Sequence, residues 1–443
     1  MTEPTRPGPF RLGIAGLGTV GTGVIRLLDE HADLLEARAG RRIEVVAVSA
    51  RDRSRDRGID LDRWTWCANP AELAGLAGLD AVVEVVGGTD GPALDLAQAA
   101  LKAGRPVVTA NKAMIAAHGF ALAETAEANG AAILFEAAVC AGTPILKTLR
   151  EGMVGNRVDR IEGILNGTSN YILSAMERSG EDFAETLGEA QRLGYAEADP
   201  ALDVDGGDAA HKLAILAALA FGLRPDFAGV EVEGIRDIRA ADILQAERLG
   251  YSIRLVAMAD LERQDGAPAR LLQRVRPCLL PADHPLADID GPTNAVLAQG
   301  DYAGPILIQG AGAGSESTAS AIVADIVALA RGEARPAFAV PSAGLVPAER
   351  ADSGAREARY YLRFVVADRP GVLAELAAAM RDARVSIQSL IQEGESVGED
   401  EAGITIAVVT HKAPARNVRE ALAQLKDSPS IAEPPLAMPI MMS

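Results

Sequence analysis

The first part of the chain contains the sequence RLGIAGLGTVG at residues 11–21, and its pattern predicts how this part folds. A short apolar run leads into a GxGxxG turn at 16–21, and the helical pattern VGTGVIRLLDE follows. In this order, glycines allow a tight turn and let backbone N–H groups at a helix N-terminus approach a pyrophosphate. The motif alone is weak evidence. Its strand–turn–helix context favours a dinucleotide site over a glycine turn that serves only packing.

On both sides of this turn, from residue 10 to about residue 136, apolar runs alternate with helix-length amphipathic segments. The runs are RLGIAGLG, IEVVAVSA, DAVVEVVGG, RPVVTAN and AAILFEA. Such alternation predicts parallel strands with crossover helices, which is an α/β fold built on a Rossmann-type doubly wound sheet. We place this dinucleotide-binding domain at residues 1–139.

The end of the second run bears on the choice of cofactor. An NAD-selective site places an acidic residue there, but Ser49 and Ala50 stand in its place, and Arg51 leads a run of arginines. Guanidinium groups can pair with a 2′-phosphate. We therefore expect NADP, with Arg51 as its contact. NAD stays an alternative, as does a merely solvated Arg/Asp loop.

The remaining chain divides into two further domains. Residues 140–335 mix helical and strand-like patterns, and the segment AADILQAERLGYSIR (240–254) is among those expected to be helical. This predicts a mixed α/β domain for catalysis and dimerisation. Prolines and small polar residues make 336–357 a linker. Residues 358–443 follow a β-α-β-β-α-β order, which predicts a ferredoxin-like module.

Carboxylates gather in GYAEADPALDVDGGDAAHK, residues 194–212. Pro200 and the glycine pair before Asp208 predict a loop that enters a helix, so Asp208 and Lys212 should lie one turn apart on one face. Such a group suits an amino-acid substrate, although a calcium-like loop or a solvated helix start would share this composition. Lys112 follows the strand RPVV, at the sheet edge where ligands of such folds bind.

The composition excludes several classes of protein. The 443 residues carry 43 basic and 61 acidic side chains, a net charge of −18, which repels nucleic acids and acidic membrane surfaces. Three separated cysteines form no CxxC pair, which favours a reducing, cytoplasmic setting over a disulfide scaffold or thiolate zinc site. The N-terminus lacks a signal pattern, and we expect no membrane segment.

Seven motifs together give the chain a specific family resemblance. They are GLGTVG (16–21), EVVGG (84–88), TANK (109–112), EAAVCAGTPI (136–145), NGTSNYIL (166–173), the 194–212 segment and QGAGAG (309–314). Residues 10–335 resemble homoserine dehydrogenase, and the C-terminal module resembles an ACT domain. The resemblance implies reversible NAD(P)-dependent interconversion of L-homoserine and L-aspartate 4-semialdehyde, in the biosynthesis of threonine, methionine and isoleucine.

The resemblance also implies roles for individual residues. The catalytic lysines fall on Lys212, the general acid/base, and Lys112. Substrate-binding carboxylates fall on Glu197 and Asp208, with Asp203 as a neighbouring candidate. Cofactor contacts fall on Gly16, Leu17, Gly18, Thr19, Val20, Gly21, Gly87, Lys112 and Gly314. A monovalent cation, Na⁺, falls to Glu136, Val139, Ala141 and Thr143, because a carboxylate and backbone carbonyls suit a hard ion.

For the C-terminal module, the resemblance implies an amino-acid effector site in the loop DRPGVL (368–373), with Asp368, Gly371 and Val372 as its residues. The implied effector is threonine, acting by feedback, and the implied assembly is a homodimer or homotetramer. A module that serves only assembly is the alternative. For the whole chain, the alternatives are a ligand sensor without turnover and a semialdehyde dehydrogenase that acylates Cys140, which lacks a histidine partner in the sequence around it.

Overall fold

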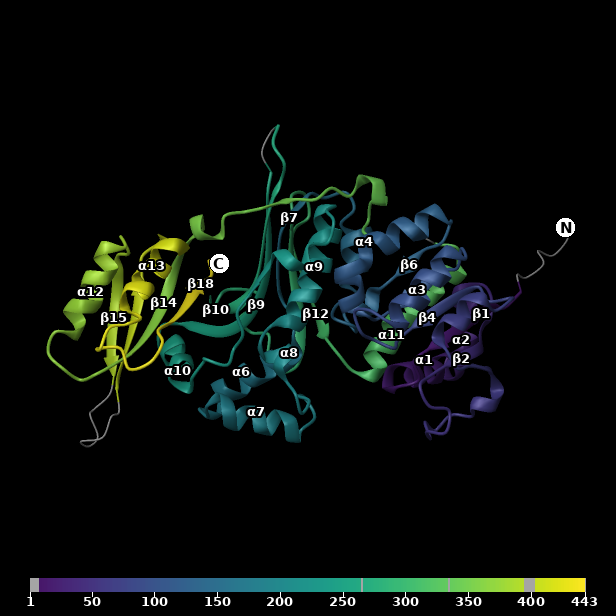
Figure 1. Ribbon diagram of the computed structural model, residues 1–443, viewed down its shortest axis with the longest axis horizontal. Coiled ribbons are helices and arrows are strands. Elements are labelled where there is room, and N and C mark those ends of the chain that lie inside the picture. Colours follow the sequence, from purple (N-terminus) through teal and green to yellow (C-terminus); the bar gives the residue numbers. More distant parts are fainter. Residues whose placement is uncertain (1–7, 264–265, 334, 394–402, 443) are drawn as a thin grey trace.

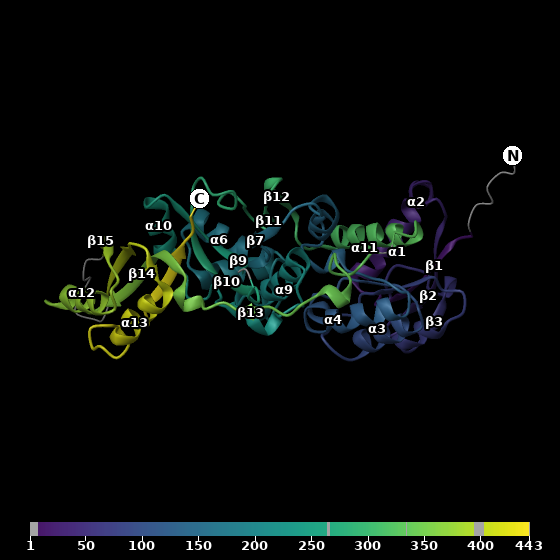
Figure 2. The ribbon, with the colours of Figure 1, turned by 90° about the horizontal axis from the view of Figure 1, so that it is seen from above.

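The computed structural model describes residues 8–263, 266–333, 335–393 and 403–442. The chain forms an elongated molecule with the N-terminal domain at one end, the C-terminal module at the other, and a mixed sheet between them (Figure 1). The view from above shows the same order of parts (Figure 2). In these described ranges, no helix is both long and apolar enough to cross a membrane.

The N-terminal domain is a parallel six-stranded sheet in the order β3-β2-β1-β4-β5-β6. This is the doubly wound order of dinucleotide-binding domains, so the predicted fold is confirmed. Its strands are β1 (Phe10–Ala15), β2 (Ile43–Ser49), β3 (Thr65–Cys67), β4 (Ala81–Glu84), β5 (Val107–Thr109) and β6 (Ile133–Leu134). The edge strand β3 was not expected, because three residues are too short to make an apolar run.

Helices cover both faces of this sheet. They are α1 (Thr19–Glu30), α2 (Ala32–Ala39), α3 (Pro92–Lys102), α4 (Lys112–Ala128) and, from much later in the chain, α11 (Ser315–Ala330). The buried face of α11 joins one core cluster with β1 and α1. Residues that we assigned by sequence to the second domain thus complete the first.

The middle of the molecule is a larger mixed sheet covered by helices. Its strands are β7 (Val158–Ile164), β8 (Val230–Val232), β9 (Tyr251–Glu262), β10 (Arg270–Pro281), β11 (Thr293–Gly300) and β12 (Gly304–Ala311). The covering helices are α6 (Gly167–Ser179), α7 (Phe183–Arg192), α8 (Ala201–Val204), α9 (Gly207–Phe221) and α10 (Ala240–Arg248). Among these, α6, α9 and α10 contact β9.

The expectation of one helix over 240–254 is wrong at its C-terminal end. Helix α10 ends at Arg248, and Gly250 has a φ of +81°, which a glycine adopts without steric cost. The chain then turns into β9, which pairs along its full length with β10. The aromatic and branched residues of YSIRLVAM suit this strand, and the helical periodicity before them concealed the change.

The C-terminal module has the predicted β-α-β-β-α-β order. It comprises β14 (Glu357–Val366), α12 (Val372–Asp382), β15 (Ile387–Glu393), β16 (Ile404–Thr410), the two-residue β17 (Ala413–Pro414), α13 (Ala415–Leu425) and β18 (Leu436–Ile440). The four main strands are antiparallel in the order β18-β14-β16-β15. Strand β18 also bridges to β10 in parallel at Ile440 and Leu279, so the module continues the sheet of the middle domain.

The segment 336–357, expected as a linker, is held against the domains that it connects. Ser342 donates its N–H and hydroxyl to Glu127 on α4. Farther along, the short strand β13 (Glu349–Arg350) pairs with β10. The chain reaches the module as a strap bound along the surface.

A buried ion pair fastens the module to helix α10. Asp242 is fully buried, and it accepts hydrogen bonds from the guanidinium of Arg363 and, at 3.0 Å, from the hydroxyl of Tyr361, both on β14. Burial raises the pKa of Asp242, and the Arg363 cation opposes this. The carboxylate therefore depends on Arg363 for its charge balance.

Replacing Arg363 by methionine should loosen this junction. Arg363→Met keeps much of the side-chain volume but leaves the Asp242 carboxylate buried without its cation. Loss of this partner should lower the free energy of unfolding by about 3 kcal/mol. Amide hydrogens of β14 should then exchange roughly 100-fold faster, measured by hydrogen–deuterium exchange and mass spectrometry. Arg381→Met, at the exposed pair with Asp382, is the control and should leave β14 unchanged. Equal protection of β14 in Arg363→Met and the unaltered protein would contradict this role.

Candidate functional site

The glycine-rich turn has the geometry that a dinucleotide requires. Gly16 has a φ of +98°, and a Cβ there would lie 2.3 Å from the carbonyl oxygen of Val85. A Cβ on Gly21 would lie 1.9 Å from the carbonyl oxygen of Gly16, whereas Gly18 has open space above it. Helix α1 begins with no side chain capping its first N–H groups. These free donors and the open space at Gly18 fit a pyrophosphate.

The other expected cofactor residues surround this turn. Leu17 is buried, Val20 is half-buried and Thr19 is exposed. Gly314 precedes α11, where the hydroxyl of Ser315 donates to the carbonyl of Thr19 at 2.7 Å, so the start of α11 lies against the turn. Gly87 has a φ of +85° and no atom within 4 Å of its Cβ position, which leaves room for a ligand.

The arginine run after β2 is only partly free. Arg53 pairs with Asp62 at 2.9 Å, and Arg57 donates to the carbonyl of Leu17 at 3.1 Å, which ties the run to the glycine-rich turn. Arg51 is exposed and makes no ion pair within the described ranges. Its guanidinium is therefore available to a ligand at the end of β2.

A buried network holds the loop before Lys112. Glu84, at the end of β4, accepts the N–H groups of Val86 and Gly87 and the hydroxyl of Thr109 at 2.5 Å. Asn111 completes the network, since it caps α4 and donates to the carbonyl of Gly88 at 2.7 Å. The ends of β4 and β5 are thus fixed together. No role for Glu84 was predicted from the sequence, although it begins the EVVGG motif.

The centre of the site is the carboxylate of Asp208, which is 5% exposed. Its oxygens lie 2.7 Å from Lys212 Nζ, 3.0 Å from Lys112 Nζ and 2.8 Å from the amide nitrogen of Asn166. Burial alone would raise the pKa of Asp208, but the two ammonium groups outweigh it and hold this pKa well below its usual range. The predicted one-turn spacing of Asp208 and Lys212 on α9 is confirmed.

Lys212 lies at the base of this cluster. It is 7% exposed, and its ammonium also donates to the carbonyl of Leu165 at 2.7 Å. Burial would lower the pKa of Lys212, but the Asp208 carboxylate outweighs it and raises this pKa. Lys112, one-third exposed at its side chain, faces the same carboxylate from α4 of the nucleotide-binding domain. The two lysines therefore meet across the junction of the two domains.

The other two expected carboxylates differ in their placement. Asp203 accepts a hydrogen bond from Asn166 at 2.7 Å, and burial together with nearby Asp208 raises its pKa. Glu197 is exposed in the loop after α7, and its side chain makes no hydrogen bond or ion pair in the part of the chain described. The structure brings Asp203 into the lysine cluster and leaves Glu197 at the rim.

Two neighbours of the cluster were missed by sequence reasoning. Asn166 bridges Asp203 and Asp208 while capping α6 through Ser169 N–H, and its position directly after a strand was the available signal. His211 stacks on Phe227, and burial and the Lys112 charge lower its pKa. A histidine inside an alanine-rich helix gave no comparable signal.

The segment expected to hold a cation surrounds Glu136. This side chain is 2% exposed and accepts the N–H groups of Leu146 and Lys147, while burial and Asp325 raise its pKa to about 7. The carbonyls of Val139 and Ala141 accept no hydrogen bond within the described residues. The hydroxyl of Thr143 is also buried without a partner there. This oxygen-rich site has unused acceptors, which fits a hard cation.

Two further expectations concern Cys140 and the C-terminal loop. Cys140 is buried, and burial raises the pKa of its thiol to about 12, which argues against a cysteine that is acylated by substrate. In the loop at 368–373, Gly371 has a φ of +98° and open space above it, Asp368 is exposed, and Val372 is buried at the start of α12. Their arrangement leaves room for a ligand at the helix N-terminus.

Comparisons with known proteins agree along the whole chain. Residues 16–136 match the NAD-binding domain of homoserine dehydrogenase, residues 144–327 match the homoserine dehydrogenase family, and residues 360–429 match the ACT domain. A homoserine dehydrogenase from Pseudomonas aeruginosa is 40% identical over 437 residues, which cover 96% of this chain and 97% of that protein.

Two solved structures extend the comparison. A homoserine dehydrogenase from Thiobacillus denitrificans has a TM-score of 0.88 and 39% identity, over 98% of each chain. A hyperthermophilic archaeal homoserine dehydrogenase in complex with NADPH has a TM-score of 0.61 and 28% identity, over 72% of this chain and 97% of that one. With its nucleotide-binding turn, its lysine–carboxylate cluster and its C-terminal ACT domain, this oxidoreductase belongs to the homoserine dehydrogenase family.

Proposed function

We propose that the chain interconverts L-homoserine and L-aspartate 4-semialdehyde at the Asp208 cluster. The observation that carries this proposal is the meeting of Lys112 and Lys212 on one buried carboxylate, at the junction of the nucleotide-binding and middle domains. When bound at the glycine-rich turn, a nicotinamide cofactor supplies the hydride acceptor for the alcohol carbon or the hydride donor for the aldehyde carbon.

Lys212 is the proton-transfer group in this proposal. In the reduction direction, its ammonium gives a proton to the oxygen that forms from the aldehyde. In the oxidation direction, its neutral amine takes the hydroxyl proton of homoserine. Asp208 keeps Lys212 protonated and oriented, and Lys112 adds a second cation beside the same carboxylate. No covalent intermediate with the protein is needed.

Substrate binding uses the acidic side of the site. The α-ammonium of homoserine pairs with Asp208 and Asp203, and Glu197 closes on it from the exposed loop at the rim. The loop is tied to α6, because Thr168 donates to the carbonyl of Tyr195 at 2.8 Å and the rings of Tyr171 and Tyr195 stack. Support for this assignment is the position of Asn166, which already orients both buried carboxylates.

A monovalent cation, Na⁺, is proposed for the Glu136 site. Glu136 would supply charge and the main-chain carbonyls of Val139, Ala141 and Thr143 would supply ligands. The free carbonyls of 139 and 141 support it. Its role here is structural, because Glu136 holds the start of α5 (Ile145–Lys147) through two N–H groups and thereby fixes the segment that borders α9.

The cofactor preference and the regulation are part of the same proposal. Arg51 favours NADP over NAD through a 2′-phosphate contact, and the archaeal relative in complex with NADPH supports this choice.

Threonine is proposed as the effector at Asp368, Gly371 and Val372, as feedback from a pathway to threonine, methionine and isoleucine. A cytoplasmic homodimer or homotetramer is proposed for the working enzyme.

Removing the Lys212 amine should abolish most turnover. Lys212→Met fills the same buried space without a titratable group, and loss of a general acid/base lowers kcat by about 10²- to 10⁴-fold. The rate is followed through NADPH absorbance in both directions, and NADPH binding by fluorescence titration should stay the same. Lys426→Met, at an exposed position directly after α13, is the matched control. A variant at position 212 that keeps more than about a tenth of kcat would exclude this role.

The Asp208 carboxylate should set the pH dependence of turnover. Because Lys212 has a raised pKa, reduction should decline and oxidation should rise as the pH increases through that value. Asp208→Asn removes the charge that raises this pKa, so the midpoints of both kcat profiles should move to lower pH. Asp203→Asn removes a weaker influence and should move them less. Unmoved or rising midpoints in Asp208→Asn would show that another group titrates.

Arg51 should select between the two cofactors. Arg51→Ala removes one charge-assisted contact, which should raise KM for NADPH about 10- to 100-fold and leave KM for NADH unchanged. Arg55→Ala, in the same run, is the control and should change neither value. If Arg51→Ala raised both KM values equally, the side chain would contact a part that the two cofactors share.

A further inference from the structure

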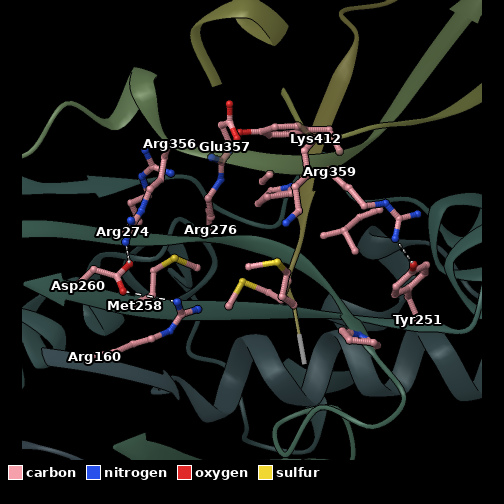
Figure 3. Close-up of a pocket in the computed structure, with 17 residues that line it drawn as sticks. Arg160, Tyr251, Met258, Asp260, Arg274, Arg276, Arg356, Glu357, Arg359 and Lys412 are labelled. Atoms are coloured by element: carbon pink, nitrogen blue, oxygen red, sulfur yellow. Dashed lines mark hydrogen bonds and ion pairs between the residues drawn. The ribbon is translucent and has the colours of Figure 1, made fainter. Parts of the chain in front are cut away.

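A cationic cavity lies between the middle domain and the C-terminal module, and none of its lining residues belongs to the proposed active site. Its volume is about 510 Å³, and side chains of β7, β9 and β10 face those of β14 and β18 across it. Figure 3 shows Arg160 and Met258 on one side and Arg356, Glu357 and Lys412 on the other. Its cationic side chains are Arg160, Arg274, Arg276, Arg356, Arg359 and Lys412.

The cavity lies on the face of the mixed sheet turned away from the catalytic helix α9. Side chains alternate along β9, so Ala257 and Ala259 join the core on the α9 side, while Met258 belongs to the core cluster on the opposite face and lines the cavity. A ligand in this cavity would therefore be separated from the lysine cluster by the sheet itself. The cavity is a second site and not an extension of the first.

Carboxylates inside the cavity do not balance its cations. Asp260 is shared, at 2.7 Å from Arg356 and 3.6 Å from Arg160, and Glu357 is exposed. Arg160 also pairs with Glu162, and Arg356 also pairs with Glu262 at 3.4 Å, and both of these carboxylates lie outside the cavity lining. Arg359 donates to the hydroxyl of Tyr251 at 3.2 Å instead of to a carboxylate. Neither Arg359 nor Lys412 has an acidic partner within the described ranges. These two side chains bring positive charge to the cavity that no described carboxylate pairs, in a protein whose net charge is −18.

The two arginines of β10, Arg274 and Arg276, line the cavity and pair with carboxylates outside its lining. Arg274 is 6% exposed, and burial lowers its pKa. The nearby Arg276 cation also lowers this pKa, whereas the Glu231 carboxylate raises it. Arg276 pairs with Glu233, which is more than half exposed, and its Nε is buried with no hydrogen-bond partner in the described part of the chain. Both paired carboxylates come from β8 and the residue after it, outside the cavity lining.

We propose that this cavity binds a small organic polyanion, a compact molecule with two or more phosphate or carboxylate groups. Guanidinium groups bind both kinds of anion with paired hydrogen bonds. The charges of Arg359 and Lys412, which have no acidic partner within the described ranges, would receive the anionic groups. Met258, Met441 and Tyr251 give one side of the cavity an apolar surface for the body of the molecule. The volume suits a small-molecule site.

Such a ligand would touch both parts of the molecule at their junction. Strand β18 meets β10 through the Ile440–Leu279 bridge and the hydrogen bond from Met441 N–H to the carbonyl of Leu279 at 2.9 Å. Cations on β10 and on β14 would share one anion across this junction. Binding should therefore slow hydrogen exchange in β18, besides producing heat in a titration.

The test is calorimetric titration of the full chain with pyrophosphate and, separately, citrate, in saturating NADPH so that the nucleotide site is filled. At least one of the two probes should bind saturably, more weakly as salt rises, and slow exchange in β18. Arg359→Gln with Lys412→Gln should lower its affinity at least tenfold. Lys102→Gln with Lys426→Gln removes two exposed charges elsewhere and should change it less than twofold.

Which probe binds distinguishes phosphate from carboxylate chemistry. Lys412→Gln alone changes an exposed side chain and so keeps the test valid if the double variant misfolds; it should also weaken binding measurably. Threonine, which carries no net charge, should bind the double variant as it binds the unaltered protein. The proposal is overturned if neither probe binds, if the cavity variants bind the probe unchanged, or if only threonine loses affinity. These outcomes do not depend on turnover, so they are distinct from failure of the proposed reaction.

Discussion

The carboxylate of Asp208 between two lysines is the interaction on which the site depends. A buried carboxylate costs free energy unless cations and hydrogen bonds compensate for it, and here Lys112, Lys212 and Asn166 do so. These partners come from three separate elements, since α4 supplies one lysine, α9 the other, and the start of α6 the amide. The nucleotide-binding and middle domains must therefore be docked for the charge to be balanced.

Contacts around the site hold the nucleotide-binding and middle domains together. Helix α9 packs against α4 and against the mixed sheet, and the network around Glu84 fixes the loop that leads into α4. Helix α11 returns from the middle domain to pack on α1, with Ser315 bonded to the glycine-rich turn. The chain crosses between the domains more than once, so the cofactor turn and the lysine cluster are held in one arrangement and not on independent bodies.

Local features of this architecture could be predicted from the sequence, whereas long-range ones could not. The glycine-rich turn and the spacing of Asp208 and Lys212 depend on neighbours in sequence, so periodicity and helix geometry were sufficient. The contacts of Asn166 with Asp203 and Asp208 span 37 and 42 residues, and no local pattern encodes them. The same holds for α11, whose apolar face gives no sign of which domain it covers. Strand β9 was hidden because a helical pattern leads directly into it.

The C-terminal module is joined to the proposed active site by continuous packing. Tyr361 and Arg363 of β14 bind Asp242 on α10, and α10 packs against α6, whose first turn is capped by Asn166. Since Asn166 also binds Asp208, a shift of α10 that moved α6 would alter the carboxylate that sets the protonation of Lys212. An effector bound to the module can act through these contacts if its affinity differs between two arrangements of the protein in which α10 has different positions. The buried pair of Asp242 and Arg363 would transmit the preference of the proposed effector, because Asp242 cannot separate from β14 without leaving a charge unbalanced.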